Sequence, residues 1–162
     1  MNPRTTDRPW RQRLKKALMV GLVLGAVSLG VFIWRMFVLV NDEIPTAYAG
    51  WAVWELIDTH LMERSNHWPR SIAELQAVVH VHQQRRRSVY WPVNDLTNRI
   101  SVDWSVDIEA LRASAKTNAS HPLLVTRRDG RPINPVWGKD VEPNQKLGQI
   151  LGLPVGFLRA TN

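Results

Sequence analysis

The chain of 162 residues contains no cysteine, which excludes a disulfide-stapled domain and any thiolate-based metal or redox site. It also lacks a G-x-S-x-G nucleophile elbow, a phosphate-cradling glycine loop and an H-E-x-x-H zinc motif. Internal repeats and low-complexity linkers are absent as well. We therefore expect no catalytic residue, no cofactor and no bound metal, and a particular enzymatic activity has no support in the sequence.

The chain does contain one long apolar run, residues 17–40, whose single charge is Arg35. As a helix, 24 residues cover about 36 Å, against a hydrocarbon core of about 30 Å. Trp34 and Arg35 then fall near the outer interface, where both side chain types are common. The run predicts one transmembrane helix, residues 17–40, between a basic tail, residues 1–16, and a domain, residues 41–162.

The tail carries six cations and one acid, while Asp42 and Glu43 follow the apolar run. Cations that flank a span are retained on the cytoplasmic side. The sequence therefore predicts a single-pass protein of a bacterial-type inner membrane, with its N-terminus in the cytoplasm and residues 41–162 outside. The residues that carry this topology signal are Arg4, Arg8, Arg11, Arg13, Lys15 and Lys16.

A cleaved signal peptide is the alternative to a signal-anchor. Ala47-Tyr48-Ala49, followed by Gly50, has the A-x-A form of a cleavage site. Against cleavage, the apolar run exceeds the 7–15 residues of a signal h-region. The sequence leaves open whether the domain is released after Ala49, and we favour the retained anchor.

Small residues lie at four-residue spacing within the apolar run, at Gly21 and Gly25. This spacing places both glycines on one helix face, where a second helix can approach closely. Pairing of two such helices in a homo-oligomer is one hypothesis, and chance spacing of common membrane residues is the other.

The net charge of +7 lies mostly in the tail. From Asn41 onward the chain has fourteen Lys or Arg and thirteen Asp or Glu. The sequence therefore does not favour nucleic acid as a partner, since binding it needs a strongly basic surface. One basic cluster remains, Arg85, Arg86 and Arg87 with Tyr90 and Trp91 behind it, and this cluster is a candidate surface for a protein partner.

Periodicity predicts helices at the start of the domain. A helix is expected over residues 46–64, with Val53, Trp54, Ile57 and Leu61 on its apolar face and Glu55, Asp58, Thr59 and Glu63 on its polar face. Residues 65–69 interrupt it. Ser71-Ile72-Ala73-Glu74 then has the form of a capping box that begins a second, short helix.

Strands are expected after residue 99. Apolar residues alternate with polar residues at Ile100, Val102, Trp104 and Val106, as in a strand with one solvent-exposed face. Residues 123–128 and 131–137 flank Asp129-Gly130, a dipeptide typical of hairpin turns. A helical turn is expected over residues 108–115, and a last short helix is expected to begin at Pro143 and to be ended by Gly152. The predicted fold class is α+β, with two helices packed on one small antiparallel sheet after the transmembrane helix.

The candidate chemical groups are sparse. His80 and His82 form the one close histidine pair, and on a helix they face different directions, which makes a poor chelate. Asp103 and Asp107 share one strand face, about 13 Å apart, too far for paired carboxylate catalysis. Residues 118–120, Asn-Ala-Ser, match a glycosylation sequon, which matters in a eukaryotic secretory pathway.

Tryptophan is abundant, with eight residues in the chain and six beyond residue 41. We expect most of these six rings in the core, because each contributes a large apolar area. Trp68 and Trp91 are the candidates for partly exposed rings that contact a partner or a sugar.

The order of elements, together with Trp68-Pro69-Arg70-Ser71-Ile72-Ala73-Glu74-Leu75, resembles the plan of type IV pilin-like proteins and pseudopilins. Many of these have an aromatic-Pro-x-Ser element after a long helix. They also have a glycine before the apolar run and a glutamate within it, whereas this chain has Lys15-Lys16 and no acid there. The resemblance therefore implies a related domain on a different anchor, a layout also similar to other bacterial single-pass proteins.

Together these features predict a membrane-anchored, non-catalytic interaction or structural protein, an accessory subunit of a cell-envelope assembly. A pilin-like assembly component is one alternative. A membrane-tethered hydrolase or carbohydrate-binding module is another, and it would require a concave cluster of polar side chains.

Overall fold

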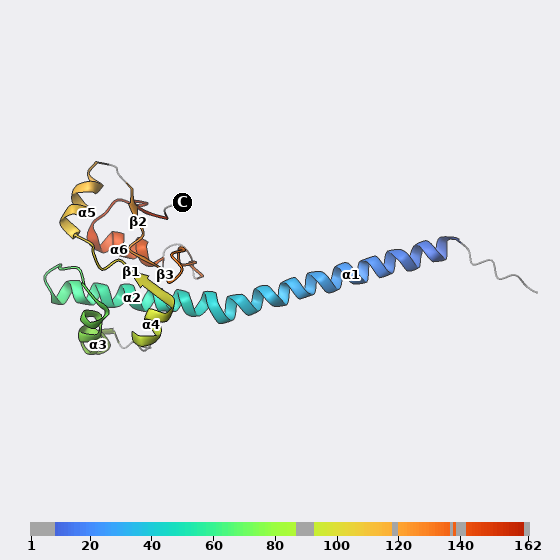
Figure 1. The fold of residues 1–162 in the computed structure, drawn as a ribbon, viewed down its shortest axis with the longest axis horizontal. Coiled ribbons are helices and arrows are strands. Elements are labelled where there is room, and N and C mark those ends of the chain that lie inside the picture. The colour runs from blue at the N-terminus through green and yellow to red at the C-terminus, as the bar shows by residue number, and fades with distance from the viewer. Residues whose placement is uncertain (1–8, 87–92, 118–119, 137, 139–141, 161–162) are drawn as a thin grey trace, which may run out of the picture. The chain divides into compact units, whose positions relative to one another are not determined.

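The structure is a computed structural model that describes residues 9–86, 93–117, 120–136, 138 and 142–160 (Figure 1). The chain divides into two compact units, the first ending at Asn41 and the second beginning at Asp42. The elements are α1 (Pro9–Val38), the π-helical turn η1 (Leu39–Glu43), α2 (Ile44–Glu63), α3 (Ile72–Arg86), α4 (Val93–Arg99), β1 (Ile100–Val102), α5 (Ile108–Ala115), β2 (His121–Pro122), β3 (Val125–Arg127), α6 (Pro143–Leu151) and β4 (Leu158–Arg159).

The first unit consists of α1, and its apolar side chains are exposed along the helix, among them Leu22, Val27 and Phe32. Within the described residues one helical stretch, which contains α1, is long and apolar enough to cross a membrane. The prediction of a single long apolar helix near the N-terminus is confirmed.

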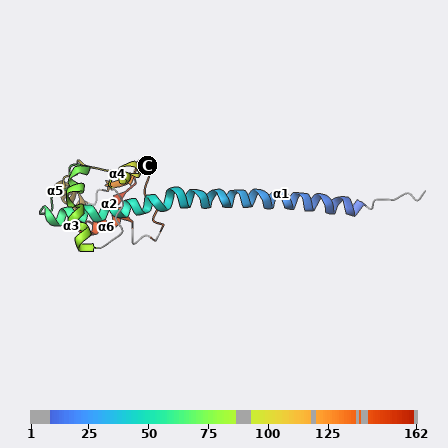
Figure 2. The same ribbon diagram turned by 90° about the horizontal axis from the view of Figure 1, so that it is seen from below.

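The second unit is α+β, as predicted, and its central element is α2. Figures 1 and 2 show α3 and α4 on one side of α2, with α6 and the strands on another. The predicted apolar face of α2 is buried, but so are Asp58 and Thr59, which the sequence placed on a wet face. The prediction that Asp58 and Thr59 lie on a solvent-exposed face is wrong, because α3 packs against α2 on the side of these residues.

Four short strands form two separate pairs among the described residues. β1 pairs antiparallel with β3, with Ile100 opposite Arg127. β2 pairs parallel with β4, which the sequence did not predict. The expected alternation through Val106 stops at Val102, because the carboxylate of Asp103 accepts hydrogen bonds from the amide and hydroxyl of Ser105 and so forms a turn.

The predicted turn at Asp129-Gly130 is present, but the chain after it, residues 131–136, does not form the expected second strand. Gly130 has a φ of 81° and donates its N–H to the carbonyl of Arg127 over 2.9 Å. One return hydrogen bond follows, from the Arg127 amide to the Arg131 carbonyl. Pro132 and Pro135 have no N–H to donate, which explains why regular pairing does not continue.

The last helix, α6, begins and ends as predicted. The carboxylate of Glu142 accepts hydrogen bonds from the Asn144 and Gln145 amides, and Pro143 starts the first turn. Gly152, with a φ of 71°, ends the helix in the left-handed conformation that glycine adopts without strain. The helix that contacts α2 is therefore fixed at both ends by local sequence.

Asn144 connects α6 to the chain around β3. It is 1% exposed, and its side-chain oxygen accepts from the amides of Leu124 and Val125 at 2.8 and 2.9 Å. Its side-chain nitrogen donates to the Val125 carbonyl at 2.7 Å. One side chain thus satisfies three buried backbone groups that would otherwise lack partners.

The start of the second unit is joined to β3 by ion pairs. Arg127 is 12% exposed and pairs with the carboxylates of Asp42 and Glu43, the latter at 3.0 Å. Burial opposes the charge of the guanidinium, but its hydrogen bond to Asp42 and the nearby carboxylates outweigh this effect and raise the Arg127 pKa. Residues 42–43 therefore belong to the packed domain.

Two further local predictions differ from the structure. Residues 93–99 form α4, a helix that the sequence did not predict. α3 begins at Ile72 as expected, but the predicted capping box does not form, because the Glu74 carboxylate accepts from the Arg70 amide at 3.0 Å and not from the Ser71 amide. The chain between Trp68 and Ser71 therefore folds back over the first turn of α3.

We expect Asn144→Leu to lower the free energy of unfolding by about 3 kcal/mol or more, because it leaves two amides and a carbonyl buried without partners. Urea unfolding of the detergent-solubilised chain, followed by near-ultraviolet circular dichroism, measures this loss. Asn134→Ala replaces an exposed asparagine whose side chain makes no hydrogen bond to the described residues, and it should change the same quantity by no more than about 0.5 kcal/mol. Equal losses in both variants would contradict the assigned role.

Candidate binding groove

The loop between α2 and α3 has an unusual backbone. Ser65 and Asn66 have φ values of 52° and 64°, and the Asn66 amide donates to the Leu61 carbonyl at 2.9 Å. This hydrogen bond ends the helix in the manner of a Schellman motif, without a glycine. Two left-handed residues that are not glycine store strain, a feature that is found more often at functional loops than elsewhere.

Trp68 anchors this loop to the remainder of the domain. Its ring is 4% exposed, and the indole N–H donates to the Asp103 carbonyl at 2.7 Å. The prediction that Trp68 presents a partly exposed ring is therefore wrong. The reason is that the adjacent Asp103 turn offers a carbonyl to the indole N–H, so the whole ring can be buried with its polar group satisfied.

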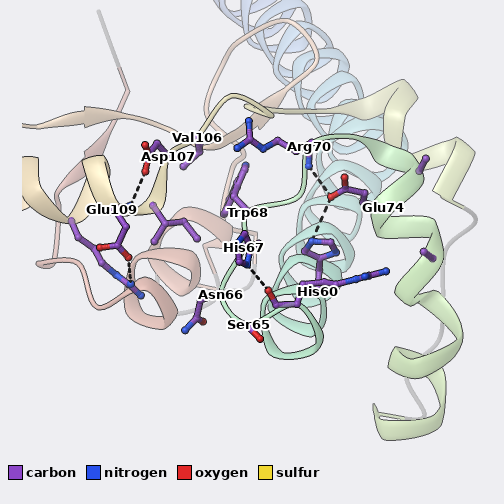
Figure 3. Close-up of a pocket in the computed structure, with 15 residues that line it drawn as sticks. His60, Ser65, Asn66, His67, Trp68, Arg70, Glu74, Val106, Asp107 and Glu109 are labelled. Atoms are coloured by element: carbon purple, nitrogen blue, oxygen red, sulfur yellow. Dashed lines mark hydrogen bonds and ion pairs between the residues drawn. The ribbon is translucent and has the colours of Figure 1, made fainter.

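A groove of about 1050 Å³ lies over this loop. The end of α2, residues 64–70, the first turns of α3 and residues 106–112 line it (Figure 3). Its volume is at the upper end of the range of ligand sites, about 300–1,000 Å³. The floor combines apolar groups, such as Trp68 and Val106, with charged groups at the rim.

His60 is the buried polar group of the groove. Its side chain is 4% exposed, and Nε2 lies 3.6 Å from the Glu74 carboxylate. Nδ1 is buried with no hydrogen-bond partner among the described atoms. Burial lowers the pKa of His60, and this effect outweighs the raising effect of Glu74. The imidazole is therefore held mainly in its neutral form beside the groove.

The carboxylates of the groove already accept hydrogen bonds from the protein itself. Glu74 accepts from the Arg70 amide, and Asp107 caps α5 by accepting from the amides of Glu109 and Ala110. Glu109 pairs with Arg112 at 3.1 Å. The acids at this site therefore have a structural use, and the expected shared strand face of Asp103 and Asp107 does not exist.

Two guanidinium groups of the groove are different. Among the described residues, neither the Arg64 nor the Arg70 side chain has an ion pair or a hydrogen bond. In Figure 3 the Arg70 side chain extends from the loop above Trp68. Because the lining also contains Glu74, Asp107 and Glu109, the groove carries charges of both signs next to its apolar groups.

A second set of polar side chains joins α2 to α3 away from the groove. Thr59 donates to the Glu55 carbonyl, and its oxygen lies 3.0 Å from His82 Nδ1. His82 Nε2 lies 3.4 Å from the Glu55 carboxylate. This hydroxyl–imidazole–carboxylate order resembles a catalytic triad, but Thr59 and His82 are buried, so a substrate has no access to the hydroxyl. The set links the two helices.

The predicted histidine pair does not form a site. His82 is buried against α2, whereas His80 is exposed and lies 2.8 Å from Gln84. In the part of the chain that the structure describes, no three His, Asp or Glu side chains are grouped so that they could hold a metal ion.

Of the cluster predicted as a basic partner surface, the structure describes only the side chain of Arg85. The Arg85 side chain is half exposed and pairs with Glu63 of α2, which makes it a contact between α2 and α3. The side chain of Arg86 and all of Arg87, Tyr90 and Trp91 lie outside the described residues, as do Asn118 and Ala119 of the sequon.

Those residues predicted for topology and helix pairing that the structure describes lie on α1. Arg11, Arg13, Lys15 and Lys16 are exposed at its start, while Arg4 and Arg8 lie outside the described residues. Gly21 and Gly25 are exposed, and a side-chain carbon added at either position would have no described atom within 4 Å outside the helix backbone.

Sequence reasoning missed the residues that make the groove, above all Arg64, Arg70 and His60. The available signal was the pair of interruptions around them, Ser65-Asn66 and Pro69, which predicts an irregular, folded-back connection. It did not reveal that residues 106–112 lie opposite, because that proximity depends on tertiary packing.

Comparison of the chain with protein-family models, with curated proteins and with solved structures gives no match. The fold therefore defines the protein only by class: a small α+β domain with a groove lined by apolar and charged groups among the described residues, and a long apolar helix earlier in the chain.

The buried state of His60 predicts a pH dependence. Its pKa is lowered in the folded chain, so below about pH 6.5 the unfolded chain binds the proton and the folded chain resists it. The contribution of His60 to stability is thus present above that pH and is lost as the pH falls. We expect His60→Gln to flatten the decline of unfolding free energy between about pH 7 and pH 5.

His67→Gln is the matched control, because His67 is an exposed histidine of the same groove. Urea unfolding of the wild type and both variants across this pH range makes the comparison, and the contributions of other groups are shared by all three proteins. A decline that is equally steep in His60→Gln would show that His60 does not carry the effect.

Proposed function

We propose that this chain is a single-pass inner-membrane protein, with its N-terminus in the cytoplasm, whose outer domain binds a partner in an envelope assembly. The observation that carries the proposal is the exposed apolar surface of α1. Side chains such as Leu18, Leu22 and Phe32 are uncovered along the helix. Such a surface is unfavourable in water and favourable in a bilayer.

The packing of the second unit supports a retained anchor. Ala49 is fully buried, and Asp42 and Glu43 neutralise the largely buried Arg127. Cleavage after Ala49 would remove these residues from the domain and leave the guanidinium of Arg127 without its two carboxylates. A buried charge that loses its partner is costly. The mature domain is therefore expected to keep the segment that leads to α1.

A binding role suits the groove better than a catalytic role. The groove offers guanidinium groups, carboxylates and apolar side chains, which are the groups that ligand sites use for binding. Thr59 and His82 of the triad-like set between α2 and α3 are buried, so the hydroxyl is closed to solvent. A tethered hydrolase, the alternative from another functional class, would need a reactive group that faces the groove together with an activating partner.

Intact mass measurement of the protein in membrane and soluble fractions tests the anchor. We expect the full-length mass in the membrane fraction. Leu24→Lys together with Val27→Lys should move the protein out of that fraction, since each charge at the centre of a span costs about 2.5–3.5 kcal/mol. Leu14→Lys, a control on the same helix outside the apolar run, should leave the distribution unchanged.

Two other measured masses would contradict a full-length anchor. A soluble species that begins at Gly50 would overturn the anchor and make the domain a secreted one. Loss of about 16 residues, with the remainder in the membrane, would favour processing of the pilin-like kind that the resemblance raises.

A further inference from the structure

His60 of α2 is buried in an environment that suits only its neutral form. Its side chain is 4% exposed, and Nδ1 has no hydrogen-bond partner among the described atoms. A neutral imidazole carries one N–H, whereas an imidazolium carries an N–H on both nitrogens. A proton on His60 would therefore add a buried N–H donor where no described atom accepts it, and such a donor destabilises the closed arrangement.

The carboxylate beside His60 also holds the α2–α3 loop, residues 64–71. The Oε2 atom of Glu74 lies 3.6 Å from His60 Nε2, and the same atom accepts a hydrogen bond from the Arg70 amide at 3.0 Å. Figure 3 shows Glu74 between these two residues, with a dashed line to each. Because both contacts use one oxygen, a positive charge on His60 attracts the atom that now fixes the Arg70 amide.

The charged groups around His60 as a whole disfavour a proton on its imidazole. Burial lowers the pKa of His60 and Glu74 raises it, while Arg64 and His67 add to the lowering. The other ionisable groups on the surrounding elements are Arg70, then Asp107, Glu109 and Arg112 across the groove, and the pairs Glu55–His82 and Glu63–Arg85 between α2 and α3. The closed loop therefore resists the proton, and an arrangement in which water reaches Nδ1 accepts it more readily.

The α2–α3 loop is suited to local opening. Ser65 and Asn66 have left-handed φ values of 52° and 64°, which are unfavourable for residues other than glycine. Residues 64–67 are exposed, whereas Trp68 is buried and anchors the loop through its bond to the Asp103 carbonyl. A strained segment with few buried apolar contacts opens at a lower free energy than the remainder of a domain.

We propose that His60 makes this loop a proton-operated latch: a proton on the imidazole draws Glu74 from the Arg70 amide, and the loop on both sides of the Trp68 anchor opens to water. In the open form water reaches Nδ1 and stabilises the added proton. The latch is closed above about pH 6.5, the ordinary pKa of histidine, and opens as the pH falls below this value. The latch goes beyond the proposed function, since it requires neither a partner nor a membrane.

Amide hydrogen exchange of the detergent-solubilised full chain, followed by nuclear magnetic resonance, tests the latch. The reporters are the Asn66 amide, which donates to the Leu61 carbonyl, and the Arg70 amide. We expect their protection factors to fall about threefold or more between pH 7.5 and pH 5.5. The fall should not exceed about tenfold per pH unit, which is the limit for uptake of one proton.

Urea distinguishes local opening from unfolding of the whole domain. The reference is the Leu124 amide, which donates to the buried Asn144 side chain. At pH 5.5, low urea concentrations should accelerate the exchange of Leu124 and leave that of Asn66 and Arg70 unchanged, because local opening exposes little surface. The Trp68 indole N–H should exchange more slowly than both loop amides, since its bond to Asp103 is kept.

Two variants assign the effect to one histidine. His60→Gln should keep the protection of the Asn66 and Arg70 amides within about twofold over the same pH range, because glutamine does not titrate. His67→Gln, which removes an exposed histidine of the same loop, should keep the pH dependence of the wild type.

A measurement on the wild type tests the same assignment without a substitution. The ring resonances of His60 should titrate below about pH 6.5, and titration at or above that pH would overturn the proposal. So would loop amides whose protection does not change with pH, changes equally in His60→Gln, or depends on urea as the Leu124 amide does.

Discussion

The domain depends on the burial of α2 on more than one side. Elements from distant parts of the chain, α3 and α6 among them, pack against this one helix. Burial on several sides makes its polar side chains depend on partners within the protein. Thr59 lies 3.0 Å from His82 Nδ1, whereas His60 has Glu74 at 3.6 Å from Nε2 and no hydrogen-bond partner for Nδ1 among the described atoms. At Gly50 a side-chain carbon would lie 2.7 Å from Ile133, so the missing side chain lets the following chain approach α2 closely.

The same helix determines where the groove lies. The loop after α2 contains two left-handed residues, Ser65 and Asn66, and Trp68 holds this loop against the Asp103 turn. The arginines that flank this loop therefore occupy fixed positions although they lie outside regular structure. Rigid support of a polar loop is a common way to build a recognition site, because side chains are then oriented before the ligand arrives.

Local signals in the sequence predicted much of the fold and little of the groove. Glu142, Pro143 and Gly152 mark both ends of α6, and residues 108–115, where a helical turn was expected, form the eight-residue helix α5. The predicted exposure of Trp68 was wrong, since the position of the Asp103 carbonyl is a property of the tertiary structure. The pairing of β2 with β4 was missed for a similar reason. Each of these strands has only two residues, too few to show an alternating pattern, and the two strands lie far apart in the sequence.

Asn144 has a consequence for the order of synthesis. It satisfies the backbone around β3 only after residue 144 is available, and α6, which covers α2, is complete only at Leu151. The first helix of the domain thus leaves the ribosome well before the segment that covers it. A nascent chain of this protein must keep the apolar side of α2 unfolded or shielded until α6 has emerged.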